Sequence, residues 1–339
     1  MKILYGIASD GTGQEARSRV LLDHLAARGH DLAVVATSNG RITAASPFDR
    51  RFRPDVVISD HDAWSWREAF DRRIPILSID SMRILSRSDL PDVVRNHRGV
   101  RVHLPYSRAF VRSKLPLCDR YFVSSFFRPP IQAARTQVFA PVVRSAVIAA
   151  GRRSKRRGEH LLVVLPSGGR AELLRALYAS GVPCRIYGSP LFDERVTGNL
   201  RERPFDEQTF VEDLASSRAV VMAGSSSLLG EALYLRKPVL AVALESRSEE
   251  TLEARTLELE GFGTFVSRLD GTTLPRFLDA VPRFRENLAG YRQNGNRDLL
   301  EGLDAWLAEK ARGRAPNPVE SPCVAPASRS RAVVVDTAA

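Results

Sequence analysis

A run of glycine and serine, Gly224-Ser225-Ser226-Ser227, follows a short apolar segment in the second half of the chain. Residues 219–222 before it are typical of a buried strand, and the residues after it have helical spacing. Backbone N–H groups and hydroxyls therefore converge at a helix N-terminus, an arrangement that suits a diphosphate. Within the same helix, the Glu231 carboxylate can accept two hydroxyl hydrogen bonds from a ribose diol. The alternative is a serine-rich helix cap with a solvated glutamate.

A second glycine-containing loop, Asp10-Gly11-Thr12-Gly13, lies between the apolar segment 3–7 and a helical pattern over 15–28. Glycine permits close approach of the backbone to a ligand, and the helix N-terminus offers N–H groups to an anion. A dinucleotide fingerprint needs three glycines with GxGxxG spacing, and the third position here is Ala16. The loop therefore argues against NAD as a cofactor.

Short apolar runs alternate with amphipathic segments along the chain, which predicts βαβ units and parallel sheets. In the first half, Asp10, Asp60 and Asp80 follow or end predicted strands. Because ligands collect at the carboxyl ends of parallel strands, all three acids are candidates by position. In the second half, strands are expected at 161–165, 184–187, 219–222 and 238–242, and the last helix at about 297–312.

The 339 residues allow two domains of ~150 residues each and a tail. We predict an N-terminal, acceptor-side domain over 1–145 and a C-terminal donor domain over 146–312. The boundary lies close to the basic run 152–157, which is typical of linker or surface charge. Residues 313–339 are rich in Pro, Ser, Ala and Arg, and we expect them to be disordered.

Composition limits the classes of protein and partner. The formal net charge of +11 favours phosphate-rich ligands, nucleic acid or an anionic membrane, and says nothing about fold. The three cysteines have no CxxC spacing, so we expect neither disulfides nor a metal site. No apolar run approaches the ~20 residues that span a bilayer. We expect a cytoplasmic protein without a nucleic-acid partner, with peripheral contact at the inner membrane face as an alternative.

The segment 203–255 resembles the donor-binding segment of bacterial GT-B glycosyltransferases related to the MurG-type and UDP-glucuronosyltransferase-like enzymes. Within this family, it is most similar to the generic glycosyltransferase and teichoic acid biosynthesis types. The likeness rests on Ala223-Gly224-Ser225, Glu231-Ala232-Leu233 and Arg236-Lys237-Pro238-Val239-Leu240. It extends more loosely over residues 1 to about 310. It implies an α/β fold of GT-B architecture, with two Rossmann-like domains facing a cleft.

The resemblance also implies roles for individual residues. Ser225, Ser226 and Ser227 would hold the diphosphate, and Glu231 would hold the ribose. Phe205 would lie beside the base, and Ser167-Gly168 would face the phosphates. The positions that read the sugar are Glu249-Glu250 and Glu253-Ala254, where relatives carry an acid/Gln pair and Asn-Ala. The acceptor-side loop would be Gly11-Thr12-Gly13-Gln14 with Arg17. No cofactor is implied, because the nucleotide-sugar is a substrate.

The first loop departs from the family, since relatives often have Gly-His where this chain has Gly13-Gln14. Glutamine cannot act as the general base that transfer to an alcohol usually needs. We take His61 as the candidate base, oriented by Asp60 or Asp62, with an exposed loop histidine as the alternative. Asp10 and Asp60 are reserve bases. A phosphate or amine acceptor needs no strong base.

These features predict a glycosyltransferase that moves a sugar from a nucleoside diphosphate donor, most simply a UDP-sugar, to an unknown acceptor. Inversion without a metal is expected, with the serine run and helix dipoles stabilising the leaving diphosphate. One alternative is a sugar-nucleotide 2-epimerase on the same fold, since fold does not decide chemistry. Another is a non-enzymatic binder of anionic polymers, whose affinity would fall steeply with salt.

Overall fold

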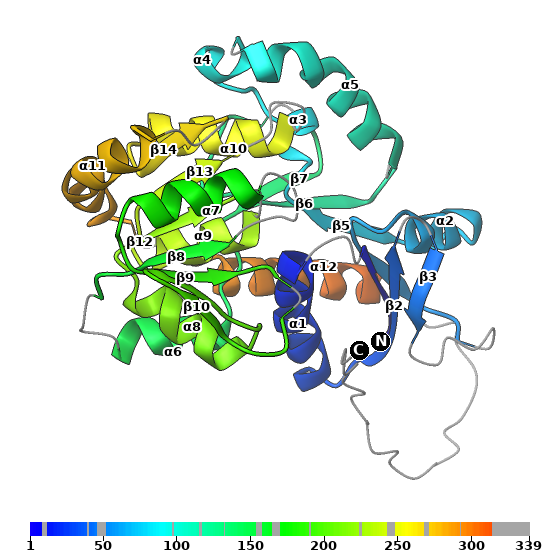
Figure 1. Cartoon of the computed structure of the whole chain (residues 1–339). Coiled ribbons are helices and arrows are strands. Elements are labelled where there is room, and N and C mark those ends of the chain that lie inside the picture. Colours follow the sequence, from blue (N-terminus) through cyan, green and yellow to red (C-terminus); the bar gives the residue numbers. More distant parts are fainter. Residues whose placement is uncertain are drawn as a thin grey trace, which may run out of the picture.

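The strands of the first half form one sheet in the order β3-β2-β1-β4-β5-β6-β7 (Figure 1). Neighbouring strands are parallel, except that β3 runs antiparallel to β2. All five residues of β4 and of β5 are buried, as expected for strands covered on both faces. The strands are β1 (Lys2–Ala8), β2 (Asp31–Ser38), β3 (Arg41–Ala45), β4 (Val56–Asp60), β5 (Ile76–Asp80), β6 (Arg120–Ser124) and β7 (Thr136–Phe139).

The structure is a computed structural model. It describes residues 1–8, 12–38, 41–45, 52–96, 98–114, 117–131, 133–153, 158–164, 170–189, 191–223, 226–242, 248–267, 271–291 and 293–313. The predicted tail therefore lies outside the described residues, apart from Gly313. No helix in these ranges combines the length and the apolar character that a membrane crossing requires.

The second half repeats the design, with strand order β10-β11-β9-β8-β12-β13-β14. Its pairs are parallel, except for the antiparallel pair β10 and β11. The strands are β8 (Leu161–Val164), β9 (Cys184–Tyr187), β10 (Arg195–Thr197), β11 (Leu200–Glu202), β12 (Ala219–Met222), β13 (Val239–Val242) and β14 (Gly263–Val266). The fold is thus α/β with two parallel-sheet units, as the sequence predicts.

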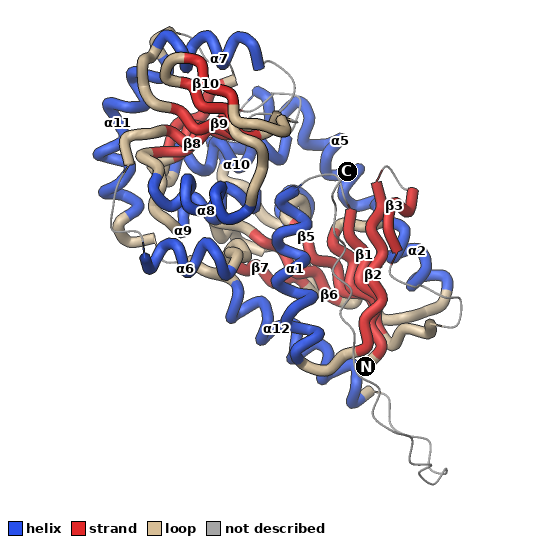
Figure 2. The backbone as a smooth tube through the Cα atoms, turned by 60° about the horizontal axis from the view of Figure 1, so that its bottom comes forward, coloured by secondary structure: helices blue, strands red, loops and turns tan. Residues whose placement is uncertain are grey.

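Helices follow most of the strands and cover the two sheets (Figure 2). In the first half they are α1 (Thr12–Ala27), α2 (Ala63–Asp71), α3 (Ile84–Arg87), α4 (Asp92–Arg95) and α5 (Arg98–Lys114). In the second half they are α6 (Ser145–Arg153), α7 (Arg170–Ala179), α8 (Glu207–Ser216), α9 (Ser226–Tyr234), α10 (Ser248–Leu259), α11 (Thr273–Leu288) and α12 (Asn296–Arg312).

The last helix returns to the first sheet. Leu299, Leu303, Trp306 and Leu307 of α12 are buried in the same cluster as residues of β1, β4 and β5. Polar contacts agree, since Lys310 Nζ donates to Asp119 Oδ1 at 2.9 Å. Figure 2 shows α12 beside α1 and the first sheet. The domain boundaries predicted from the sequence put this helix in the C-terminal domain, whereas it packs on the sheet of the N-terminal domain.

The chain crosses between the sheets twice, and the two crossings are hydrogen-bonded to each other. Val143 N donates to Asn296 Oδ1 at 2.8 Å, and Asn296 Nδ2 donates to Val143 O at 2.7 Å. Gly295 N donates to Pro141 O at 3.0 Å. This double crossing fixes where one sheet meets the other. Its residues Pro141 and Val142 line the pocket described in the next section.

Some elements differ from the sequence prediction. The junction region forms α6, which buries Val147 and Ala150, so the basic run begins on a helix and not in a linker. Its residues 154–157 lie outside the described part of the chain. The long helices α5 and α11 were not predicted. Trp64 and Trp66 of α2 are partly buried and pack against a small core cluster.

Candidate active site

A narrow pocket lies where the two halves of the chain meet. The first half contributes Arg17 of α1, Ser124 at the end of β6 and residues that follow it. The second half contributes Ser227, in the first turn of α9, and Glu253 of α10. The side chains that line it are Arg17, Ser124, Ser125, Phe126, Pro141, Val142, Ser227 and Glu253. The pocket thus joins the predicted acceptor-side loop region to the start of the predicted phosphate-binding helix.

Arg17 is held in this pocket by a buried ion pair with Asp60 at the end of β4. Arg17 Nε donates to Asp60 Oδ2 at 3.2 Å, and Nη2 donates to Oδ1. Ser18 Oγ donates to the same carboxylate at 2.8 Å. Burial opposes the charged guanidinium, but the Asp60 carboxylate outweighs it and raises the pKa of Arg17. The remaining nitrogen, Nη1, takes no part in this pair.

His61 follows Asp60 directly, and its conformation is unusual. Its φ of 56° is in the left-handed region, which non-glycine residues seldom adopt, and the residue is only 4% exposed. Strained backbone of this kind persists where the surroundings fix it, and it is frequent at functional sites. His61 thus lies buried at the carboxyl edge of the first sheet, so the exposed-loop alternative is wrong.

Asp62 fixes the chain on the other side of His61 by capping α2. Its carboxylate accepts from Ser65 N at 2.7 Å and from Thr37 Oγ1. Gly6 of β1 makes room for this cap, because a Cβ there would overlap Ser65 and Asp62. The Asp60 carboxylate thus accepts from Arg17 and Ser18, and the Asp62 carboxylate accepts from Thr37 and from the first turn of α2. Orientation of His61 by either carboxylate stays a prediction.

Asp80, the third acid at a strand end, accepts hydrogen bonds from neighbouring residues of its own chain segment. It accepts from Ser78 Oγ at 3.0 Å, from Arg83 N at 2.7 Å and from Arg83 Nε at 3.3 Å. Arg83 is 1% exposed and its guanidinium lies 5.2 Å from the ring centre of Tyr121. The Asp80 carboxylate therefore stabilises the entry to α3 and a buried arginine.

Glu231 is buried, and both of its carboxylate oxygens bond Arg144 from the chain crossing. Arg144 Nε donates to Oε1 and Nη2 to Oε2, each at 2.7 Å. Arg144 Nη1 also donates to Glu207 Oε1 at 3.1 Å, and Glu207 pairs with Arg19 of α1 at 3.2 Å. Burial opposes the charge of Arg144, yet the two glutamates raise its pKa. The predicted ribose ligand is thus occupied by a neighbouring arginine.

Phe205 lies at the surface just before α8. It is 62% exposed, and its ring centre is 5.6 Å from that of Phe210. The Arg144 guanidinium lies 5.7 Å from the Phe210 ring centre, so Phe205 and Glu231 belong to one neighbourhood. An exposed aromatic face at this place has the surface that a nucleotide base needs for stacking.

Several predicted residues lie outside the described part of the chain or have only their backbone described. The former are Asp10, Gly11, Ser167, Gly168, Gly224 and Ser225. The latter are Thr12, Gly13 and Gln14 on α1, Ser226 on α9, and Glu249 and Glu250 on α10. Among the residues that are described, no group of three or more His, Cys, Asp or Glu side chains has a metal-binding arrangement.

Two groups at the site were missed from the sequence. Arg144 lies in a segment without periodic signals, and nothing in its neighbours marks it as a partner of a residue 87 positions away. Ser124 is the last residue of β6 and Ser125 follows it. The apolar run before them was the available signal, because strand ends in a parallel sheet collect ligands.

The comparisons with known proteins identify the family. The model of glycosyl transferase family 1 matches residues 1–49 and 41–282. The chain therefore belongs to glycosyl transferase family 1.

Two archaeal relatives carry the same name, uncharacterized glycosyltransferase. The protein from Methanosarcina acetivorans is 25% identical over 240 residues, which are 64% of this chain and 62% of the relative. The protein from Methanosarcina mazei is 23% identical over 332 residues, covering 79% of this chain and 86% of the relative. The match thus spans less than two thirds of the first relative.

Solved structures share the fold at low sequence identity. Spinosyn forosaminyltransferase SpnP has a TM-score of 0.62 and 15% identity, covering 91% of this chain and 99% of its own. A UDP-glucosyltransferase from Polygonum tinctorium has a TM-score of 0.59 and 12% identity, covering 90% of this chain and 98% of its own. SsfS6 from Streptomyces sp. SF2575, complexed with thymidine diphosphate, has a TM-score of 0.56 and 16% identity, covering 90% of this chain and 99% of its own. The architecture is that of GT-B glycosyltransferases.

Proposed function

We propose that this protein transfers a sugar from a nucleoside diphosphate sugar to an acceptor, with inversion and without a metal. The observation that carries the proposal is the placement of Arg17 and the N-terminus of α9 on one pocket. The dipole of α9 and its first N–H groups attract an anion from one side. Arg17, oriented by Asp60, supplies a cation from the other. A diphosphate satisfies both.

The rest of the donor extends from this point along the second half of the chain. Glu253 lines the same pocket, 8% exposed, and would accept hydrogen bonds from sugar hydroxyls. Glu231 would accept the ribose hydroxyls once Arg144 turns away, and Phe205 would stack on the base. The UDP-glucosyltransferase and the SsfS6 complex support a uracil or thymine base.

The chemical step would be a direct displacement at the anomeric carbon. The acceptor oxygen forms the new bond while the bond between the anomeric carbon and the diphosphate oxygen breaks. The acceptor proton passes to His61, and the diphosphate leaves as an anion stabilised by Arg17 and the α9 dipole. Attack from the face opposite the leaving group inverts the configuration.

The test is a thermal shift panel with UDP, thymidine diphosphate, GDP and their sugars. A ligand at 100 times its dissociation constant should stabilise the protein by ~2.7 kcal/mol. Ser227→Ala should weaken the stabilisation, and Ser216→Ala on α8, a matched serine that lines no part of the pocket, should leave it unchanged. A panel without any shift would contradict the proposal.

Turnover then separates the two enzyme classes. A transferase releases nucleoside diphosphate in step with a glycosylated acceptor. Conversion of the donor sugar to its 2-epimer without any acceptor would instead indicate the isomerase alternative, in which Glu253 would act as an acid or base on the sugar.

A further inference from the structure

Helix α5 is basic along its whole length. Arg98–Lys114 contains four arginines and one lysine, and no Asp or Glu occurs between Val93 and Cys118. The helix lies along the edge of the molecule, next to α3, α4 and α10 (Figure 1). None of these charges is used in the proposed transfer site. This concentration of one sign of charge therefore needs a separate explanation.

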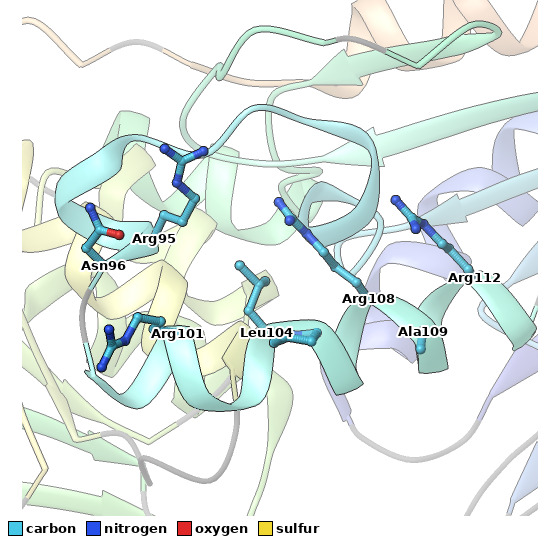
Figure 3. Close-up of a pocket in the computed structure, with 8 residues that line it drawn as sticks. Arg95, Asn96, Arg101, Leu104, Arg108, Ala109 and Arg112 are labelled. Atoms are coloured by element: carbon cyan, nitrogen blue, oxygen red, sulfur yellow. The ribbon is translucent and has the colours of Figure 1, made fainter.

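Four arginines of this region line one groove, which we name the arginine groove: Arg95, Arg101, Arg108 and Arg112 (Figure 3). The groove has a volume of about 480 Å³, and Leu104 and Pro105 also line it. Arg108 is fixed there, because its Nε donates to Leu85 O at 2.8 Å. Burial lowers the pKa of Arg108, and the like charges of Arg112 and Arg95 lower it further. Arg95 is already paired with Asp92 and, at 3.9 Å, with Asp89. Arg108 and Arg112 repel each other, and an anion between them would relieve that repulsion.

The other exposed flank of α5 has an apolar stripe formed by Val102, Tyr106 and Phe110. These residues follow i, i+4, i+8 spacing, so they share one face of the helix. They are 60%, 75% and 39% exposed, and the rings of Tyr106 and Phe110 stack with centres 6.4 Å apart. The stripe is not the packing face of α5.

The inward face of α5 packs in the hydrophobic core. Val100, Leu104 and Val111 are buried, and they lie on the opposite side from the stripe. The part of α5 that is not packed inward therefore has exposed aromatic and aliphatic side chains on one flank and the arginines of the groove on the other. Helices that lie in the plane of a membrane interface have this combination, because the apolar side enters the acyl boundary and the cations meet anionic headgroups.

We propose that α5 docks this protein on an anionic phospholipid surface, with lipid phosphates in the arginine groove and the apolar stripe inserted at the headgroup boundary. The proposal does not depend on the transferase site. A soluble polyanion would use the arginines and leave the stripe in water, so the stripe favours the lipid surface.

The experiment is co-sedimentation of the full chain with vesicles of phosphatidylcholine alone or with 30% phosphatidylglycerol. Wild type should bind the anionic vesicles and not the neutral ones. Arg101→Gln with Arg112→Gln should weaken binding about 30-fold, at ~1 kcal/mol for each arginine near the surface. Arg152→Gln with Arg153→Gln on α6 removes the same charge from another exposed site, and should change binding little.

The stripe gives the second arm of the test. Tyr106→Ser with Phe110→Ser keeps every charge and should still reduce vesicle binding at least tenfold. Both side chains are exposed, so circular dichroism should report an unchanged fold. Vesicle binding that survives this double substitution would overturn the proposal and indicate a polyanion site. Equal weakening by the α6 variant would overturn it as well, since net charge alone would then explain the binding.

Discussion

The carboxylate of Glu231 and the guanidinium of Arg144 form two parallel hydrogen bonds of 2.7 Å between α9 and the chain crossing. Glu231 is the residue that the sequence resemblance assigns to the ribose. Two groups would therefore compete for the same two carboxylate oxygens: the guanidinium of Arg144 and the ribose diol of a donor. Donor binding at Glu231 would exchange one for the other, beside the crossing that joins the two sheets.

Substitution of Arg144 should separate these two roles. Arg144→Met leaves the Glu231 carboxylate buried without its partner, which should lower the free energy of unfolding by about 3 kcal/mol in urea titrations. The combined variant with Glu231→Met should recover most of that loss, because no buried charge remains. In the single variant the nucleotide-induced thermal shift should grow. If the shift disappears instead, Arg144 is itself a donor contact.

Substitution of His61 tests the proposed base. His61→Asn keeps a residue type that tolerates positive φ, so the fold and the nucleotide-induced thermal shift should be retained. Transfer to an alcohol should fall by about 10²- to 10⁴-fold, the range of a lost general base. Full activity of this variant, measured as release of nucleoside diphosphate, would remove His61 from the mechanism.

The second crossing should be sensitive to a single methyl group. Gly295→Ala places a Cβ against the carbonyl oxygen of Ala140, and the required shift should cost about 1–3 kcal/mol of stability. A Cβ added at Gly290 would have no other atom within 4 Å. Gly290→Ala is therefore the matched control and should change stability little or raise it slightly. Chemical denaturation of both variants checks the difference. Equal effects would show that the crossing tolerates displacement.

Stability should fall as pH falls through the histidine range. Burial lowers the pKa of His160, whose Nε2 donates to Asp213 O at 3.0 Å. The unfolded chain therefore takes up a proton near pH 6.5 while the folded chain stays neutral, so stability present above that pH is lost below it. His160→Gln should flatten the decline in unfolding free energy between pH 8 and pH 5. His30, whose pKa is also lowered by burial, leaves a residual slope of the same sign. An unchanged slope in the variant would contradict this assignment.

Much of the fold follows from local patterns. Strands β4, β5, β8 and β12 are short apolar runs, and the helix that begins at Ser226 follows its glycine-serine run as predicted. Helix α5 was harder to predict because Val102, Tyr106 and Phe110 add a second apolar face opposite Val100, Leu104 and Val111. Two apolar faces obscure the helical period.

The site was less predictable, because its contacts join distant parts of the chain. Asp60 was a candidate by its place at a strand end, and its partner Arg17 was named only through the resemblance. The pairing of Arg144 with Glu231 depends on the path of the chain between the sheets, which no local pattern encodes. The helical period over about 297–312 predicted α12 correctly, yet periodicity alone does not say which sheet a helix covers.

The return of α12 to the first sheet has a consequence for synthesis on the ribosome. Domains near the N-terminus generally fold first as the chain emerges. Here the first sheet lacks the side chains of Leu299, Leu303, Trp306 and Leu307 until the last helix leaves the exit tunnel. The unit that is translated first is thus completed last, after the second sheet has emerged. Nascent chains stalled before residue 296 should expose the apolar surface of β1 and β4 to chaperones.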